Sequence, residues 1–137
     1  IKLLIHSPGG SLDVLGVLYD VIRLSATPVI GVNMGKSYSA AAMILLACHK
    51  RYGLKNSTVL FHNGSCSGIE GTFEEMKTFM QEYDKQVKQL SKIIIERTLF
   101  DEKEVEEKMK GDWYLSADKC VDKKVYDGII TSIYDLI

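Results

Sequence analysis

The chain has 137 residues and a formal net charge of -1, and 46% of its residues are hydrophobic against 26% charged, a composition typical of one globular domain over residues 1–137. The balanced charge and the lack of an apolar run of roughly 18 residues argue against a nucleic-acid or membrane partner. Three widely spaced cysteines without a C-x-x-C pair predict reduced thiols, a cytoplasmic protein and no structural metal site.

The first half of the chain alternates strand-like and helix-like segments. Apolar runs predict strands at Ile1–His6, Pro28–Val32 and Thr58–His62. A one-sided apolar pattern predicts a helix capped by Ser11, and small apolar residues predict a buried helix at Ala40–Ala47. A P-G-G turn separates the first strand from the first helix.

A long helix dominates the second half of the chain. A Gly- and Ser-rich loop at Gly64–Gly71 leads into a Thr-x-x-Glu capping box, which predicts a helix over about residues 72–98. This length exceeds what a compact domain needs, so we expect a second apolar surface to face another subunit. Short helices at Asp101–Lys110 and Ser116–Lys124 and a strand at Gly128–Ile133 follow. The alternation predicts an α/β fold of βαβ units with a mostly parallel sheet.

Three residues, in the order Ser39, His62, Asp112, lie in segments suited to nucleophilic catalysis. Ser39 precedes the small-residue helix, His62 ends an apolar strand, and Asp112 lies in a polar turn. A serine hydroxyl needs a base within reach, the base needs an orienting acceptor, and the tetrahedral intermediate needs N–H donors. The Gly-Gly turn of HSPGGS offers such donors. The pattern therefore indicates a serine hydrolase.

These segments together resemble the proteolytic subunit of the caseinolytic (Clp) proteases. The resemblance rests on S-P-G-G-S, on G-x-x-x-S before the small-residue helix, on the strand that ends in His62, on the long helix and on D-x-x-L-S-A. It runs through essentially the whole chain and implies the fold shared by Clp proteases and crotonases, with the long helix protruding as a handle. It also implies that the family's N-terminal segment, with its pore loops and first strand, is missing.

The resemblance assigns a role to each site residue. Ser39 is expected to be the nucleophile, His62 the base and Asp112 its orienting partner, without metal or cofactor. The backbone amides of Gly10 and Ala40 are expected to form the oxyanion hole, where alanine in place of the usual methionine leaves the donor unchanged. The substrate is expected to bind as an added strand along Gly9, Gly10, Asn63, Gly64 and Ser65.

Two departures from the family pattern bear on specificity and assembly. Family members commonly have H-Q-P after the strand, whereas this chain has His62-Asn63-Gly64 and an altered loop, so the resemblance does not predict its substrate preference. Family members often carry an arginine before the catalytic aspartate that helps to lock two rings together. Here Lys110-Gly111 precede Asp112.

The resemblance also implies an assembly and its partners. The expected state is a homo-oligomeric ring, a heptamer or a double ring, with active sites facing an enclosed chamber and long helices interdigitating between opposed rings. An unfoldase of the AAA+ class would feed in unfolded protein, and peptides would enter unaided.

Each assignment has an alternative from the residues alone. Ser39 can act as a helix cap, with Ser37 as the nucleophile. His62 can be a buried structural histidine, with His6 beside the Gly-Gly turn as the base, although a structural hydrogen bond is expected of His6. Asp112 can be a turn residue. His49, beside two cationic residues, is expected at a solvated helix end.

Other functions remain open at this level. A crotonase-like enzyme would use oxyanion-hole amides on an acyl-CoA and would need no Ser-His-Asp triad. A non-catalytic Clp-like ring subunit would keep the fold without activity. A phage capsid-maturation peptidase would use the same chemistry, and a signal-peptide peptidase would usually need a Ser-Lys pair and a membrane anchor.

Overall fold

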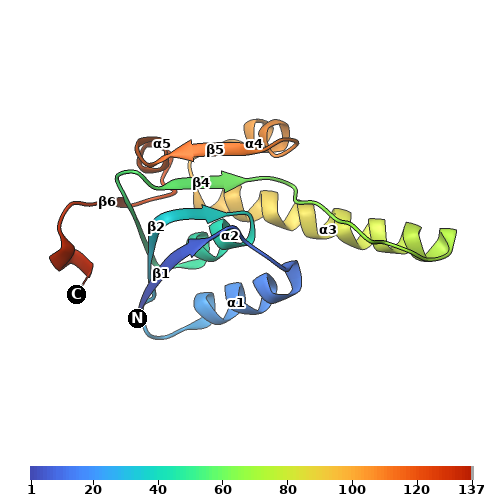
Figure 1. The fold of residues 1–137 in the computed structure, drawn as a ribbon, viewed down its shortest axis with the longest axis horizontal. Coiled ribbons are helices and arrows are strands. Elements are labelled where there is room, and N and C mark those ends of the chain that lie inside the picture. The colour runs from blue at the N-terminus through green and yellow to red at the C-terminus, as the bar shows by residue number, and fades with distance from the viewer. Residues whose placement is uncertain (137) are drawn as a thin grey trace.

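The computed structural model describes residues 1–136, which form one curled sheet covered by helices (Figure 1). Its strands are β1 (Lys2–Ser7), β2 (Ile30–Tyr38), β3 (Lys50–Leu54), β4 (Thr58–Phe61), β5 (Trp113–Ser116) and β6 (Gly128–Ile130). Its helices are α1 (Leu12–Leu24), α2 (Ala40–Ala47), α3 (Phe73–Arg97), α4 (Glu102–Lys108), α5 (Ala117–Asp122) and the 3-10 turn η1 (Ile133–Leu136). The expected α/β fold with a mostly parallel sheet is confirmed.

Strand β2 organises the sheet. The strand order is β5-β4-β2-β3-β6, with β1 also paired to β2, and every pair is parallel except β4 with β5. The first half of β2 pairs with β3, whereas its last residues, from Lys36 to Tyr38, pair with β4. Because β2 changes neighbours along its length, the sheet curls, and the end of β2 is brought beside the end of β4.

The expected strand and helix boundaries need five corrections. The second strand was predicted over Pro28–Val32 but runs from Ile30 to Tyr38, and strands β3 and β5 were missed. The last strand ends at Ile130, and Ser116 caps α5 at the end of β5 where a longer helix was expected. Pairing with distant strands is what extends β2 and creates β3 and β5.

Helix α2 is the centre of the core. Nearly all of its side chains are buried, because small and apolar residues let it pack between α1, α3 and the sheet. Its last carbonyls are bound by two arginines. Arg97 donates to the carbonyls of Leu46 and Cys48 at 3.0 and 3.1 Å, and Arg23 donates to that of Ala47 at 3.2 Å. These cations lie at the negative end of the helix dipole.

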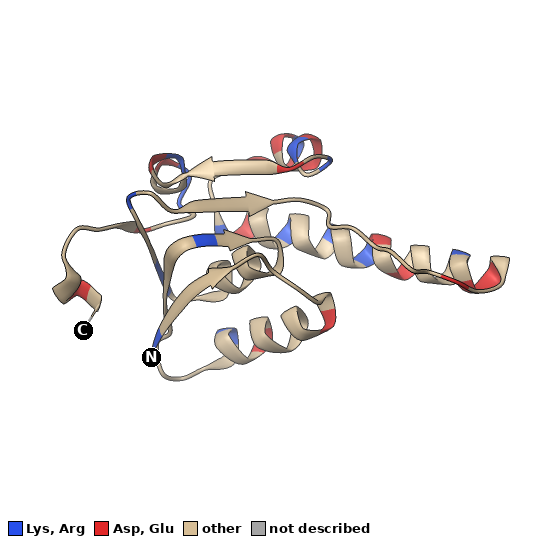
Figure 2. Cartoon of the chain, viewed as in Figure 1, with Lys and Arg blue, Asp and Glu red and all other residues tan. Residues whose placement is uncertain are grey.

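Helix α3 begins with the expected capping box and projects far beyond the sheet (Figure 1). Thr72 accepts from the Glu75 amide, and Glu75 accepts from the Thr72 amide, a contact that lowers the pKa of the Glu75 carboxyl. Residues 73–82 are all exposed, and the helix reaches the core at Leu90. Lysines and acidic residues are interspersed along its surface (Figure 2). One such pair, Lys88 and Asp84, forms an ion pair.

Candidate active site

Ser39 occupies a sharp turn between β2 and α2. Its φ of 56° and ψ of -124° are unusual for a residue with a side chain, and its hydroxyl makes no capping bond to the helix. Its amide donates to the carbonyl of Leu60 at 2.9 Å, which fixes the turn against β4. The cap alternative is therefore wrong, and the side chain is free to point away from α2.

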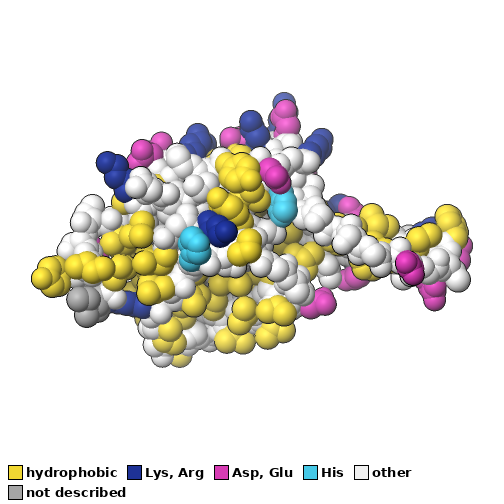
Figure 3. All heavy atoms as spheres, in the orientation of Figure 1, with side chains coloured by type: hydrophobic (Ala, Val, Ile, Leu, Met, Phe, Trp, Pro, Cys, Tyr) yellow, Lys and Arg dark blue, Asp and Glu magenta, His cyan; other side chains and the backbone are white. Residues whose placement is uncertain are grey.

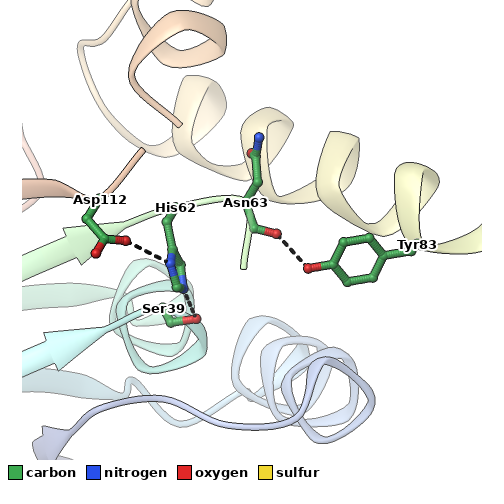
Figure 4. A network of polar contacts seen from close by, with 5 residues as sticks. All are labelled: Ser39, His62, Asn63, Tyr83 and Asp112. Carbon is green, nitrogen blue, oxygen red and sulfur yellow. Dashed lines mark hydrogen bonds and ion pairs between the residues drawn. The ribbon is translucent and has the colours of Figure 1, made fainter. Parts of the chain in front are cut away.

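His62 connects Ser39 with Asp112 (Figure 4). The His62 Nε2 lies 2.8 Å from the Ser39 Oγ, and its Nδ1 lies 3.2 Å from an Asp112 carboxylate oxygen. When Nδ1–H donates to the carboxylate, Nε2 accepts from the hydroxyl, which is the arrangement of a nucleophile, base and orienting acid. The antiparallel pair Phe61 with Trp113 explains the approach, because it brings the end of β4 beside the start of β5.

The glycine turn lies directly against the serine. Gly9 has a φ of 101°, and a Cβ there would be 2.6 Å from the Tyr38 carbonyl oxygen and 2.8 Å from the Ser39 Cβ. Only glycine fits both the conformation and the space. Ala40 is the first residue of α2, where an amide has no carbonyl one turn earlier to bind. The amides of Gly10 and Ala40 thus belong to two segments that meet at Ser39.

A cleft of about 250 Å³ opens beside these groups. Gly10, Ser39, His62, Gly64 and Ser65 line it, so three of the five expected substrate-binding residues face the cleft. The other two, Gly9 and Asn63, do not line it: the first packs behind the serine turn and the second has its backbone bonded on both sides.

Helix α3 supplies two lining residues that the sequence did not single out as site residues, Tyr83 and Leu90. The Tyr83 hydroxyl donates to the carbonyl of Asn63 at 2.9 Å (Figure 4). Both residues belong to the apolar stripe of the long helix, and that pattern indicates packing only. The one available signal was their place on a helix that follows the loop directly.

The rival residues lie elsewhere. Ser37 is fully buried on β2, and its hydroxyl has no partner within residues 1–136, so it cannot reach the cleft. His6 is exposed and packs against Gly35. The expectation for His49 is wrong: it is half-buried, and its Nδ1 accepts from the Val29 amide at 3.0 Å.

Two of the three thiols are chemically quiet. Burial raises the pKa of Cys48 to about 11 and that of Cys120 to about 12, so both stay protonated, whereas Cys66 is exposed in the loop after the site. No cluster of metal-ligating side chains occurs within residues 1–136. No helix in this part of the chain is long and apolar enough to cross a membrane.

Comparison with known proteins identifies the family. The family model of the Clp protease matches residues 1–133. The chain belongs to the Clp protease family. Among similar proteins, the ATP-dependent Clp protease proteolytic subunit 2 of Treponema denticola is 38% identical over 124 residues, which are 89% of this chain and 62% of that protein.

Two further relatives carry the same name. The ATP-dependent Clp protease proteolytic subunit 2 of Treponema pallidum is 31% identical over 99% of this chain and 69% of that protein. The subunit 2 of Pseudomonas aeruginosa is 29% identical over 96% of this chain and 66% of that protein. The chain thus spans 62% of the length of the first of these relatives.

Proposed function

We propose that this Clp family chain is a serine endopeptidase in which Ser39 attacks the peptide bond, His62 acts as the base, and the Asp112 carboxylate orients His62. The observation that carries the proposal is the unbroken chain of contacts from the Ser39 Oγ to the Asp112 carboxylate at the wall of a cleft. A crotonase-like acyl-CoA reaction would have no use for this chain of contacts.

The geometry supports a two-step reaction. Ser39 Oγ bonds to the peptide carbonyl carbon as its proton passes to His62 Nε2, and the carbonyl oxygen takes negative charge between the amides of Gly10 and Ala40. The tetrahedral intermediate then expels the amine, which receives the proton from His62. Water repeats the sequence on the acyl ester and restores the Ser39 hydroxyl. Asp112 holds the imidazole in the required tautomer throughout.

The backbone around the cleft suits an extended peptide. Gly10, Gly64 and Ser65 line it. Glycines leave the main chain open to hydrogen bonding by an added strand, which is a common way to hold a peptide without reading its sequence. We assign Gly9 and Asn63 to the support of these walls.

The relatives' names suggest the wider setting of the chain. They are proteolytic subunits of an ATP-dependent protease, so we propose that this chain acts in a homo-oligomeric ring, a heptamer or double ring, in the cytoplasm. An AAA+ unfoldase would then deliver unfolded protein. The exposed apolar residues near the start of α3, such as Phe73 and Met80, support contact with further copies of the chain.

A fluorophosphonate tests the proposal, because it reacts only with an activated serine. We expect one adduct, on Ser39, and peptide cleavage with kcat/KM lower by roughly a thousandfold or more in Ser39→Ala and in His62→Ala. Ser37→Ala is the matched control and should keep wild-type labelling. Equal cleavage by Ser39→Ala would refute the assignment, and a folded, assembled protein without any adduct would indicate a non-catalytic ring subunit.

A further inference from the structure

The peptide that follows His62 is held from two sides. The Asn63 amide donates to the carbonyl of Met109, a buried residue at the end of α4, at 3.0 Å. The Asn63 carbonyl accepts from the Tyr83 hydroxyl of α3 at 2.9 Å (Figure 4). His62 thus lies between two fixed residues. Phe61 before it is buried in β4, and Asn63 after it is held by Met109 and Tyr83.

Gly64 is matched to this tyrosine. Its φ of +84° favours glycine, and a Cβ at this position would lie 2.8 Å from the Tyr83 hydroxyl oxygen. Any larger residue would strain the backbone and push the hydroxyl off the Asn63 carbonyl. A glycine at position 64 therefore fits a tyrosine at position 83.

Tyr83 lies at the position where α3 passes from the domain into its projecting, exposed part. Residues 73–82 are exposed, whereas Tyr83 is half-buried and lines the cleft. Its ring stacks on Phe79 of the projecting part, with centroids 6.2 Å apart and planes at 12°. Burial raises the pKa of Tyr83, so its hydroxyl remains protonated and remains a donor. A shift of the projecting helix would therefore move the partner of the Asn63 carbonyl.

We propose that Tyr83 is a positioning residue, whose hydroxyl fixes Asn63 and thereby holds His62 in reach of Ser39; this rests on the proposed function. Helix α3 thereby supports the segment that carries the base. Loss of the hydroxyl lets the 62–64 segment move, so that the imidazole spends less time within hydrogen-bond distance of the serine.

Tyr83→Phe tests the proposal because it removes one hydroxyl and keeps the ring that lines the cleft. We expect kcat for a peptide to fall roughly fivefold, the worth of one lost hydrogen bond, with KM unchanged within about twofold. The melting temperature should fall by a few degrees at most, the cost of one lost hydrogen bond, and the oligomeric state should stay that of the wild type. A role in packing alone would leave the kcat of the folded fraction unchanged.

Amide hydrogen exchange gives a readout that does not need activity. In Tyr83→Phe, exchange at the Asn63 amide should accelerate roughly fivefold, because the segment that Met109 holds is now anchored on one side only. Gly64→Ala, which displaces the hydroxyl and also strains the backbone at residue 64, should accelerate exchange at least as much. Tyr134→Phe is the control: this tyrosine is exposed in η1, at the end of the molecule opposite the α3 tip (Figure 1).

The outcomes separate the two proposals. A wild-type protein that neither labels nor cleaves would refute the proposed function, and exchange at Asn63 would still decide whether Tyr83 holds the segment. An active wild type with unchanged kcat and unchanged Asn63 exchange in Tyr83→Phe would overturn the role of Tyr83 and leave the proposed function standing.

Discussion

Ser39 has a backbone conformation that its own side chain does not favour. A φ of 56° with a ψ of -124° costs about 1–3 kcal/mol for a residue other than glycine. The surrounding bonds maintain it: the Ser39 amide donates to Leu60, and its carbonyl accepts from the Ala42 and Met43 amides. Such strain turns the hydroxyl out of α2 and toward His62, as in the sharp strand-to-helix turns that present nucleophiles in known hydrolases.

The glycine turn offers a matched pair of substitutions beside this residue. Gly9→Ala places a methyl 2.8 Å from the Ser39 Cβ at a φ of 101°, so the turn must shift. We expect fluorophosphonate labelling of Ser39 to slow by roughly tenfold or more. Gly10→Ala meets nothing within 4 Å and keeps its amide, so labelling should stay within about threefold of the wild type. Labelling rates measured by mass spectrometry decide the matter.

Equal rates in the two variants would mean that the contact between Gly9 and the serine turn has no effect on the nucleophile. A drop only in Gly10→Ala would show instead that a methyl inside the cleft blocks the reagent. Thermal unfolding of both variants separates a local shift from a loss of the fold.

The residues of the candidate site differ in how far the sequence reveals them. Ser39, His62 and Asp112 each lie in a short motif that can be read locally, and the resemblance supplied their roles. Tyr83 acts through a hydroxyl that meets a backbone carbonyl twenty residues away. Nothing in an apolar helical stripe distinguishes a tyrosine that donates such a bond from one that only packs, so this residue needed the structure.

At the scale of elements, α2 links the site to the core. Its first turn carries the Ser39 junction and its last carbonyls are bound by arginines from α1 and α3. A helix of eight residues has little stability of its own, so both ends depend on tertiary contacts. The strained turn at one end thus relies on the arginine bonds at the other.

Arg97→Ala removes two bonds to the end of α2. We expect the free energy of unfolding to fall by about 2–3 kcal/mol, since two half-buried carbonyls lose a charged donor. Arg97→Lys should recover part of this, because a single ammonium keeps the charge near the helix end but cannot reach both carbonyls as a fork. Arg23→Ala, which removes one bond, should cost about half as much. Urea unfolding measures all three, and equal stability of Arg97→Ala would contradict the anchoring role.

The strands that the sequence missed are those created by distant contacts. Strand β3 reads KRYGL, with a glycine and two cations, and nothing local predicts it. Gly53 is required there because a Cβ would overlap the ring of Tyr126, a residue of the chain's last quarter. Strand β5 has only four residues, and pairing with β4 is what holds it extended. By contrast, α3 and β4 have strong local patterns and were predicted to within one or two residues.

At the scale of the whole molecule, the projecting half of α3 exposes apolar side chains that the body cannot cover. Phe73, Met76, Phe79 and Met80 are 71%, 39%, 42% and 50% exposed, and hydrophobic and acidic side chains lie together at this tip (Figure 3). Burying a side chain of this size gains about 1.5–3 kcal/mol. In a ring, every subunit presents such a tip, so the total gain from burying the tips grows with the number of subunits. This supports the proposal that the handle helices pack between opposed rings.

Substitution of the tip tests this assembly without touching the cleft. Met76→Lys with Met80→Lys places two cations on the apolar face and leaves the Phe79–Tyr83 contact in place. We expect the largest species in sedimentation to fall to about half its mass, because opposed rings separate while each ring stays closed. Thr78→Lys with Gln81→Lys adds the same charge to the other side of the exposed helix and should leave the mass unchanged. If both double variants sediment like the wild type, the tip does not join rings, and its apolar face needs another partner.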